Sequence, residues 1–422
     1  MDFLTKKLFS LFFLAALVIG CTPTQKETKS ISEMSDEELG ALADSLAQKF
    51  IIVDGHVDLP YRMNVKGFMI TKTVEDVSVE TTGNFDYPKA RRGGLDAPFM
   101  SIYVPSRYQE TGGAKEFADS LIDMVSRVPA TFPEKFAMAN TPADIEVNFA
   151  QGLISLPMGM ENGAPIGDDI SNVKYFFDRG IRYITLTHSK DNQICDSSYD
   201  TAYTWNGVSP FGEQVISEMN KWGIMVDISH VTDSAAFDAL RLTKVPVIAS
   251  HSSCRKFTPG FERNMPDTLI KALAANGGVI HINFGSTFLS KESQDKFEKM
   301  REDLTNYRAE NGLSSEDSVY TAYAKQYATD NDVFEDIQKV ADHIDHVVNL
   351  VGIDYVALGS DYDGVGDSLP KGMKDVSTYP NLIKELLKRG YMPEDIEKIC
   401  SKNTFRVWRK VQEVAKELQS EV

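Results

Sequence analysis

Two histidines occupy equivalent places in two successive segments of the chain. His230 ends the apolar run 224–230, His251 ends a second run, 245–251, and the residues between them, 232–242, have a helical pattern. Strand, histidine, helix, strand and histidine form one unit of a β/α repeat, in which neighbouring parallel strands end at the same edge of the sheet. We therefore expect both imidazoles at the edge where such folds build their sites, as part of a metal centre.

Further candidate ligands end other strand-like runs. His56 and Asp58 stand two residues apart at the end of the first run, so their side chains point to the same side of the strand. An imidazole and a carboxylate directed together suit a divalent cation such as zinc. Glu161 ends the third run, where a carboxylate could bridge two metals, although a glutamate that begins a helix is the alternative. These five ligands suffice for two metals bridged by a carboxylate and a hydroxide.

Three more residues are candidates for acting on a substrate. His188 ends the fourth run, where it could bind metal or polarise a carbonyl, although a lone histidine is more often structural. Asp361 follows the eighth run, a position suited to moving protons over a metal-bound hydroxide. Arg263 lies in a loop beyond His251, where it could pair with a substrate carboxylate, and an ordinary surface arginine is an equally good interpretation.

The order of elements predicts the architecture. Eight strand-like runs alternate with helical patterns, which is the arrangement of a (β/α)8 TIM-like barrel. The runs are 51–58, 99–104, 153–160, 181–188, 224–230, 245–251, 278–284 and 355–360. Residues 287–334 break the alternation and predict a partly helical insertion above the barrel, and three helical patterns after residue 380 predict closing helices. His281, His343 and His346 are interpreted as structural.

The amino-terminal residues have the pattern of an export signal. Two lysines precede the apolar stretch 8–19, which is too short to span a bilayer, and small Gly20 precedes Cys21 as in a bacterial lipobox. We expect a signal peptide over 1–20, lipidation of Cys21, a tether over 21–34 and a single domain over 35–422, anchored in the cell envelope by lipid alone. An ordinary signal peptide is the alternative. The net charge of −17 argues against nucleic-acid binding.

The motifs, in their order and spacing, resemble the membrane (renal) dipeptidase family of zinc peptidases over nearly the whole chain after residue 34. The segments that carry the resemblance are DGHVDLP (54–60), MENG (160–163), GIRYITLTH (180–188), SPFG (209–212), VDISH (226–230), SHSS (250–253), RNMPD (263–267) and GSDYDG (359–364).

The resemblance implies a (β/α)8 barrel of the metal-dependent hydrolase type that carries two zinc ions per chain. His56 and Asp58 would hold one ion, His230 and His251 would hold the other, and Glu161 would bridge them together with a hydroxide.

The resemblance also implies the reaction, which is hydrolysis of a dipeptide, with tolerance for a D-residue at its carboxyl end. His188 would contact the substrate and steady the oxyanion, Arg263 would bind the substrate carboxylate, and Asp361 would contact the substrate and carry the proton. Some members of the family open β-lactams, and homodimers are usual.

Three positions depart from the family's usual residues. Val57 replaces an asparagine, Asn162 replaces a glycine after the bridging glutamate, and Gly285 stands where relatives can carry a bulky tyrosine. None is a ligand, so the chemistry should survive, while Gly285 and the insertion 287–334 bear on the substrate preference. Two other functions stay open: a related amidohydrolase-type barrel acting on a cyclic amide, β-lactam or ester, and a lipoprotein that binds peptide or metal without turnover.

Overall fold

Eight parallel strands form the centre of the molecule. The computed structural model describes residues 30–67 and 71–420, so the predicted signal peptide, Cys21 and the tether up to residue 29 lie outside the described residues. The strands lie in the order β1 (Ile52–Val57), β2 (Leu95–Tyr103), β5 (Met158–Glu161), β6 (Ile181–Thr185), β7 (Met225–Asp227), β8 (Ile248–Ser252), β9 (Val279–Ile282) and β10 (Val356–Leu358).

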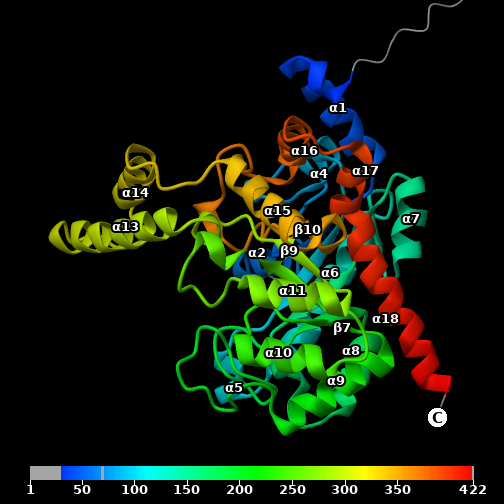
Figure 1. Ribbon diagram of the computed structural model, residues 1–422. Coiled ribbons are helices and arrows are strands. Elements are labelled where there is room, and N and C mark those ends of the chain that lie inside the picture. Colours follow the sequence, from blue (N-terminus) through cyan, green and yellow to red (C-terminus); the bar gives the residue numbers. More distant parts are fainter. Residues whose placement is uncertain (1–29, 68–70, 421–422) are drawn as a thin grey trace, which may run out of the picture.

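The ends of this sheet meet and nearly close it into a barrel. Val57 at the end of β1 bridges in parallel to Tyr362 beyond β10. The backbone N–H of Asp58 donates to the Tyr362 carbonyl at 2.8 Å, and the N–H of Asp361 donates to the His56 carbonyl at 3.1 Å. With helices around it (Figure 1), the sheet confirms the predicted (β/α)8 TIM-like fold.

Helices connect the strands and cover the outside of the barrel (Figure 1). The predicted helical pattern 232–242 is a helix, Asp233–Leu242, and the three closing helices predicted after residue 380 are present. The α-helices are α1 (Asp36–Lys49), α2 (Leu59–Val65), α4 (Tyr87–Gly93), α5 (Arg107–Thr111), α6 (Ala114–Thr131), α7 (Pro142–Ala150), α8 (Ser171–Asp178), α9 (Pro210–Trp222), α10 (Asp233–Leu242), α11 (Asp267–Asn276), α12 (Ser286–Leu289), α13 (Lys291–Glu310), α14 (Ser318–Asp330), α15 (Ile337–Val351), α16 (Tyr379–Lys388), α17 (Pro393–Glu397) and α18 (Asn403–Ser420).

The third predicted strand is wrong as a single element. The run 153–160 divides at Pro157 into β4 (Ile154–Leu156) and β5, and only β5 belongs to the barrel. The strand β4 pairs instead with β3 (Phe136–Met138) in a small parallel sheet. Proline has no N–H to donate to a ladder, so pairing is interrupted at this residue. Its carbonyl still accepts from the N–H of Met100 at 2.8 Å.

The last helix, α18, closes the amino-terminal end of the barrel. Its Phe405, Trp408 and Val411 are buried in one cluster with side chains that the strands direct inward at this end, such as Val53 and Met225. An apolar layer therefore fills the barrel below the carboxyl ends of the strands, where the predicted site residues lie.

The segment 287–334 is largely helical. Figure 1 shows α13 and α14 side by side, projecting away from the barrel. The rings of Tyr307 and Tyr323 stack at 3.8 Å between centroids and join the two helices. Across the described residues, helices of membrane-spanning length and hydropathy are absent.

Candidate metal centre

The strand ends bring the predicted ligands together at one end of the barrel. His56 and His251 belong to β1 and β8, and Glu161 is the last residue of β5. His230 follows β7 and has a φ of 70°. Residues other than glycine enter this left-handed region at some cost, and such strained residues cluster at functional sites. All four side chains are buried.

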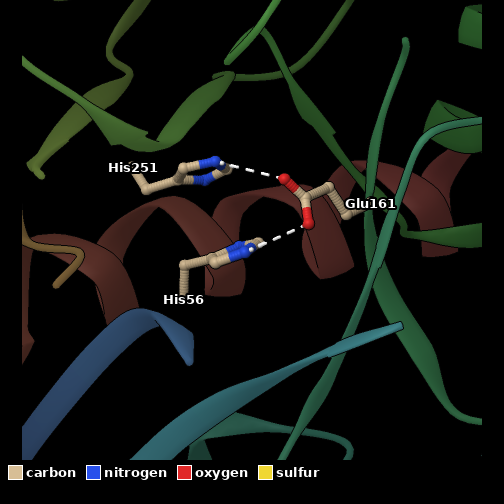
Figure 2. A group of neighbouring side chains, drawn as sticks. All are labelled: His56, Glu161 and His251. Atoms are coloured by element: carbon tan, nitrogen blue, oxygen red, sulfur yellow. Dashed lines mark ion pairs between the residues drawn. The ribbon is translucent and has the colours of Figure 1, made fainter. Parts of the chain in front are cut away.

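The carboxylate of Glu161 is the hub of this arrangement. Its Oε2 lies 3.3 Å from Nε2 of His56. Its Oε1 lies 3.1 Å from Nε2 of His230 and 3.3 Å from Nε2 of His251. Figure 2 shows the two oxygens directed at different imidazoles, His56 on one side and His251 on the other. One carboxylate therefore faces two sets of potential ligands.

Asp58 lies beside His56, and His188 lies beside Glu161. Asp58 places Oδ2 3.4 Å from Nε2 of His56, and His188 places Nε2 3.4 Å from Oε1 of Glu161. Three overlapping groups of residues have ligand atoms within 4.8 Å of one another: His56, Glu161 and His251; Glu161, His188 and His230; and His56, Asp58 and Asp361. His188 and Asp361 thus lie as close to the centre as the five predicted ligands.

The donor set fits a divalent metal. Nε2 of His56 is buried and has no hydrogen-bond partner in the part of the chain that the structure describes. Nε2 of His230 and Nε2 of His251 face each other at 2.8 Å, so a proton or a cation must lie between or beside them. Imidazole nitrogens and carboxylate oxygens converging in a buried space are the ligands that zinc takes. His56, Asp58, Glu161, His230 and His251 could hold it.

The charges at the centre favour the metal-binding protonation states of Glu161, His230 and His251, whereas at His56 burial is outweighed by Tyr183, Glu161 and Asp58, which together raise its pKa well above the ordinary histidine value. Burial alone would raise the pKa of Glu161, but the imidazoles of His56 and His188 hold it well below its usual range. Burial lowers the pKa of His230 and of His251 well below the ordinary histidine value. An ionised carboxylate and neutral imidazoles are the forms that bind a cation.

Hydrogen bonds to the Nδ1 atoms orient two of the histidines. Nδ1 of His56 lies 2.8 Å from the hydroxyl of Tyr183. Nδ1 of His251 lies 2.7 Å from the hydroxyl of Ser250, which itself donates to Asp227 Oδ2 at 2.6 Å. Because the serine proton points to Asp227, His251 donates to the serine oxygen, and its Nε2 is left for a metal. The sequence analysis assigned no role to these three supporting residues, although they lie within its motifs.

Asp361 lies beside the centre on a strained turn. It has a φ of 63°, and its Oδ2 accepts from the amide of Asn283 at 2.8 Å. Burial, followed by the nearby charge of Asp58, raises the pKa of Asp361 to about 7. A carboxyl group with this pKa can take up or release a proton near neutral pH. Asn283 was not predicted, because nothing in its strand distinguishes it from a structural asparagine.

Arg263 lies behind the centre. Its guanidinium donates to the His251 carbonyl at 2.7 Å and to the Ser252 hydroxyl at 2.8 Å. Its side chain is buried, and its Nε has no partner among the described residues. The surface-arginine interpretation is therefore wrong.

A cavity of about 490 Å³ opens onto the centre. Four aromatic residues in its wall, Tyr61, Tyr103, Tyr199 and Phe288, were missed by sequence reasoning. Tyr103 is the last residue of β2, so the rule that barrel strands end at the site could have identified it. The other three lie in helices and loops, where no periodic pattern marks them. The cavity wall also contains Asp58, Glu161, His188, Ser189, His230, Asp361, Gly364 and Val365.

The three remaining histidines lie apart from the centre. His281 bonds the Ala249 carbonyl and the Thr404 hydroxyl, at 3.0 and 2.9 Å. His343 accepts from the Cys254 N–H, and His346 pairs with Asp267. These contacts fit the structural interpretation.

Known proteins share both the sequence pattern and the fold. The sequence profile of the membrane dipeptidase family, peptidase family M19, matches residues 41–422. The structure of the probable dipeptidase PvdM from Pseudomonas aeruginosa is similar, with 24% identity, a TM-score of 0.75 and coverage of 90% of this chain and 99% of that one. A metallopeptidase from Rhodobacter sphaeroides, liganded with a phosphinate mimic of L-Ala-D-Ala, is 22% identical with a TM-score of 0.67, covering 86% and 99%.

Proposed function

This chain belongs to the membrane dipeptidase family and is a metallo-dipeptidase, and we propose that it hydrolyses L-L and L-D dipeptides at a centre of two zinc ions. The observation that carries the proposal is the position of Glu161. Its Oε2 faces His56 and its Oε1 faces His230 and His251, as a carboxylate shared by two ions requires. His56 and Asp58 would hold one ion, and His230 and His251 the other.

The protein's own side chains would bind the substrate and move the proton. Two zinc ions would lower the pKa of a water molecule and polarise the scissile carbonyl. Asp361, with a pKa of about 7, would take the proton from the water and return it to the leaving amine. His188, whose imidazole lies at the cavity wall beside Glu161, would donate to the oxygen that gains negative charge.

Arg263 would bind the carboxylate of the dipeptide. A guanidinium has five N–H bonds, and the hydrogen bonds to His251 and Ser252 leave others free, including the one on Nε. A fixed cation behind Phe288 of the cavity wall would favour a substrate whose free carboxylate lies one residue beyond the scissile bond. The tolerance for a D-residue is supported by the Rhodobacter sphaeroides relative, which was liganded with a mimic of L-Ala-D-Ala.

The lysine-bridged alternative has less support. Amidohydrolase-type barrels that open cyclic amides often bridge their metals with a lysine carbamate, whereas the cavity wall contains no lysine among the described residues. We further propose that Cys21 carries lipid, that the protein lies in the cell envelope and that it forms a homodimer. Metabolic labelling with a fatty acid, with Cys21→Ser as control, and the mass of the soluble chain in solution test these points.

The deciding experiment measures release of free amino acids by the chain from residue 30 onward. The substrates are L-Ala-L-Ala, L-Ala-D-Ala, a blocked dipeptide without a free carboxylate and the tripeptide L-Ala-L-Ala-L-Ala. Metal is removed by chelator and zinc is restored. We expect zinc-dependent cleavage of both dipeptides and little cleavage of the other two. Folded, zinc-loaded protein that leaves both dipeptides intact would contradict the proposal.

A further inference from the structure

Three aromatic rings form a continuous wall on one side of the cavity. The ring of Phe261 lies 6.2 Å from that of Tyr199 and 5.8 Å from that of Phe288, both measured between centroids. Tyr199 and Phe288 face the cavity, and Phe261 supports them from behind. We call these three residues the aromatic wall. Aromatic side chains at such distances stabilise one another and bind apolar groups with little loss of side-chain freedom.

The aromatic wall adjoins both the metal centre and Arg263. The ring of Tyr199 lies 5.9 Å from that of His230. The guanidinium carbon of Arg263 lies 5.4 Å from the centroid of Phe288, within the range of a cation–π contact. A substrate carboxylate held by Arg263 would therefore place the side chain of the same residue, the carboxyl-terminal one, beside Phe288 and Tyr199.

A glycine makes room for this wall. A Cβ atom on Gly285 would lie 2.9 Å from Cδ2 of Phe288 and 3.2 Å from Cγ1 of Val365. Both of these residues line the cavity. Any side chain at position 285 would therefore push Phe288 out of its place. The absence of a side chain at this position is the reason that α12, at the base of the insertion, can contribute a ring to the cavity.

Apart from Arg263, whose guanidinium the substrate carboxylate would occupy, the aromatic wall has no cationic neighbour among the cavity-lining residues that the structure describes. Its ionisable residues, apart from two tyrosines near the centre and Tyr199, are the five that the proposed function uses: Asp58, Glu161, His188, His230 and Asp361. Lysine and arginine are absent from the cavity wall within the described residues. A carboxylate side chain placed against the aromatic rings would lose hydration, and Arg263 would already be paired with the terminal carboxylate of the substrate.

From these contacts we infer that the aromatic wall is the subsite for the side chain of the carboxyl-terminal substrate residue, and that it selects aromatic and large aliphatic residues over small and charged ones. The inference rests on the proposed dipeptidase function and names the substrate class within it. An apolar subsite of this size distinguishes substrates by roughly 10–200-fold in kcat/KM.

The test compares kcat/KM for L-Ala-Gly, L-Ala-L-Phe, L-Phe-L-Ala and L-Ala-L-Asp. The proteins are the zinc-loaded wild type, Phe288→Ala, Phe288→Leu and Gly285→Ala. Phe237→Ala is the matched control, because Phe237 is an exposed phenylalanine on α10 outside the site. Phe288 is only half-buried, so its truncation should leave the fold intact.

We expect the wild type to prefer L-Ala-L-Phe over L-Ala-Gly and L-Ala-L-Asp by about tenfold or more. Phe288→Ala should lose about tenfold on L-Ala-L-Phe and less than threefold on L-Ala-Gly and L-Phe-L-Ala. Phe288→Leu should keep most of the preference for L-Ala-L-Phe over L-Ala-Gly. Gly285→Ala should lower this preference as Phe288→Ala does. Phe237→Ala should match the wild type on every substrate.

Three results would overturn the inference. Equal losses on all substrates in Phe288→Ala would make the residue structural, and a loss confined to L-Phe-L-Ala would assign the wall to the other substrate residue. If the wild type cleaves L-Ala-Gly at least as well as L-Ala-L-Phe, the proposed preference is wrong, while the dipeptidase function itself stands. Absence of cleavage of every dipeptide would overturn the function and the subsite together.

Discussion

The hydroxyl of Tyr183 lies 2.8 Å from Nδ1 of His56 inside the barrel. The opposite nitrogen of the same imidazole faces Glu161, and with a metal on that nitrogen Nδ1 would carry the proton and donate to the tyrosine oxygen. Partners of this kind fix the tautomer and the ring orientation of a metal-binding histidine. A Cβ on Gly159 would lie 1.9 Å from the ring of Tyr183, so the strand β5 leaves space for this partner.

Tyr183→Phe should weaken zinc binding without unfolding the protein. The variant removes the acceptor for His56 and keeps the ring that fills the barrel. We expect a loss of about 10–100-fold in zinc affinity, the usual effect of removing such a partner. Competition with a chromogenic chelator measures it. Tyr391→Phe removes a hydroxyl bonded to Asp345, distant from the centre, and should bind zinc as the wild type does.

His251→Ala should lose one metal ion per chain and nearly all activity. The imidazole lies 3.3 Å from Glu161 and 2.8 Å from His230, between the groups that would hold the second ion. Elemental analysis of the purified variant counts the metal, and dipeptide hydrolysis measures the activity. His346→Ala, at the contact with Asp267 on the outside, is the control. Full activity with unchanged metal content would refute the assignment of His251 as a ligand.

Asp361→Asn should lower kcat by about 10²–10⁴-fold while metal content and KM change little. The amide cannot take up a proton, but it keeps the shape of the side chain and its place beside Asn283. Steady-state kinetics and metal analysis of the same preparation are needed together. A variant that loses metal in proportion to activity would instead identify Asp361 as a ligand, a role compatible with its distance from His56 and Asp58.

Asp96 should make the stability of the protein depend on pH. Burial raises its pKa to about 7, even though its carboxylate accepts from the Ile52 N–H. Its pKa in the unfolded chain is about 4, so between pH 4 and pH 7 the folded state binds more protons and stability falls as the pH rises. Below pH 4 Asp96 is neutral in both the folded and the unfolded state, so it no longer lowers the stability of the protein.

Asp96→Asn should therefore be more stable than the wild type by roughly 1–4 kcal/mol at pH 8, with the difference shrinking toward pH 4. The amide oxygen can still accept from the Ile52 N–H. Urea unfolding at several pH values measures the difference. Asp44→Asn, on the exposed face of α1, is the control. A constant difference between Asp96→Asn and the wild type across this range would contradict the prediction.

Regular patterns made most of the fold predictable. Apolar runs that end in a polar residue located the barrel strands, because a parallel strand is buried along its length and ends at the site. Ser35 and Glu38 form a capping box at the start of α1, a pattern that can be read from the sequence, and both of its hydrogen bonds are present. The division of the third run at Pro157 was missed, because hydrophobicity continues across a residue that interrupts pairing.

The candidate metal ligands could be predicted from the sequence, but most of the residues that shape the cavity could not. Asn162, which replaces the usual glycine, has a φ of 81° and bonds the Val104 carbonyl and the Ala164 N–H through its side chain. Asparagine tolerates this conformation, so the backbone after Glu161 keeps its course. Phe288 and Tyr199 come from irregular segments, and their positions depend on long-range packing that no local pattern records.

The closure of the barrel has a consequence for the synthesis of the protein. The N–H of Ser360 donates to Asp54 across 306 positions of the chain, and α18 seals the other end of the barrel with residues that come later still. His56 and Asp58 therefore leave the ribosome long before the last strand that encloses them. A chain stopped before residue 360 carries all five proposed ligands and no closed barrel to hold them in place. Tightly bound metal would therefore mark completed chains and distinguish them from truncated ones that carry the same ligand residues.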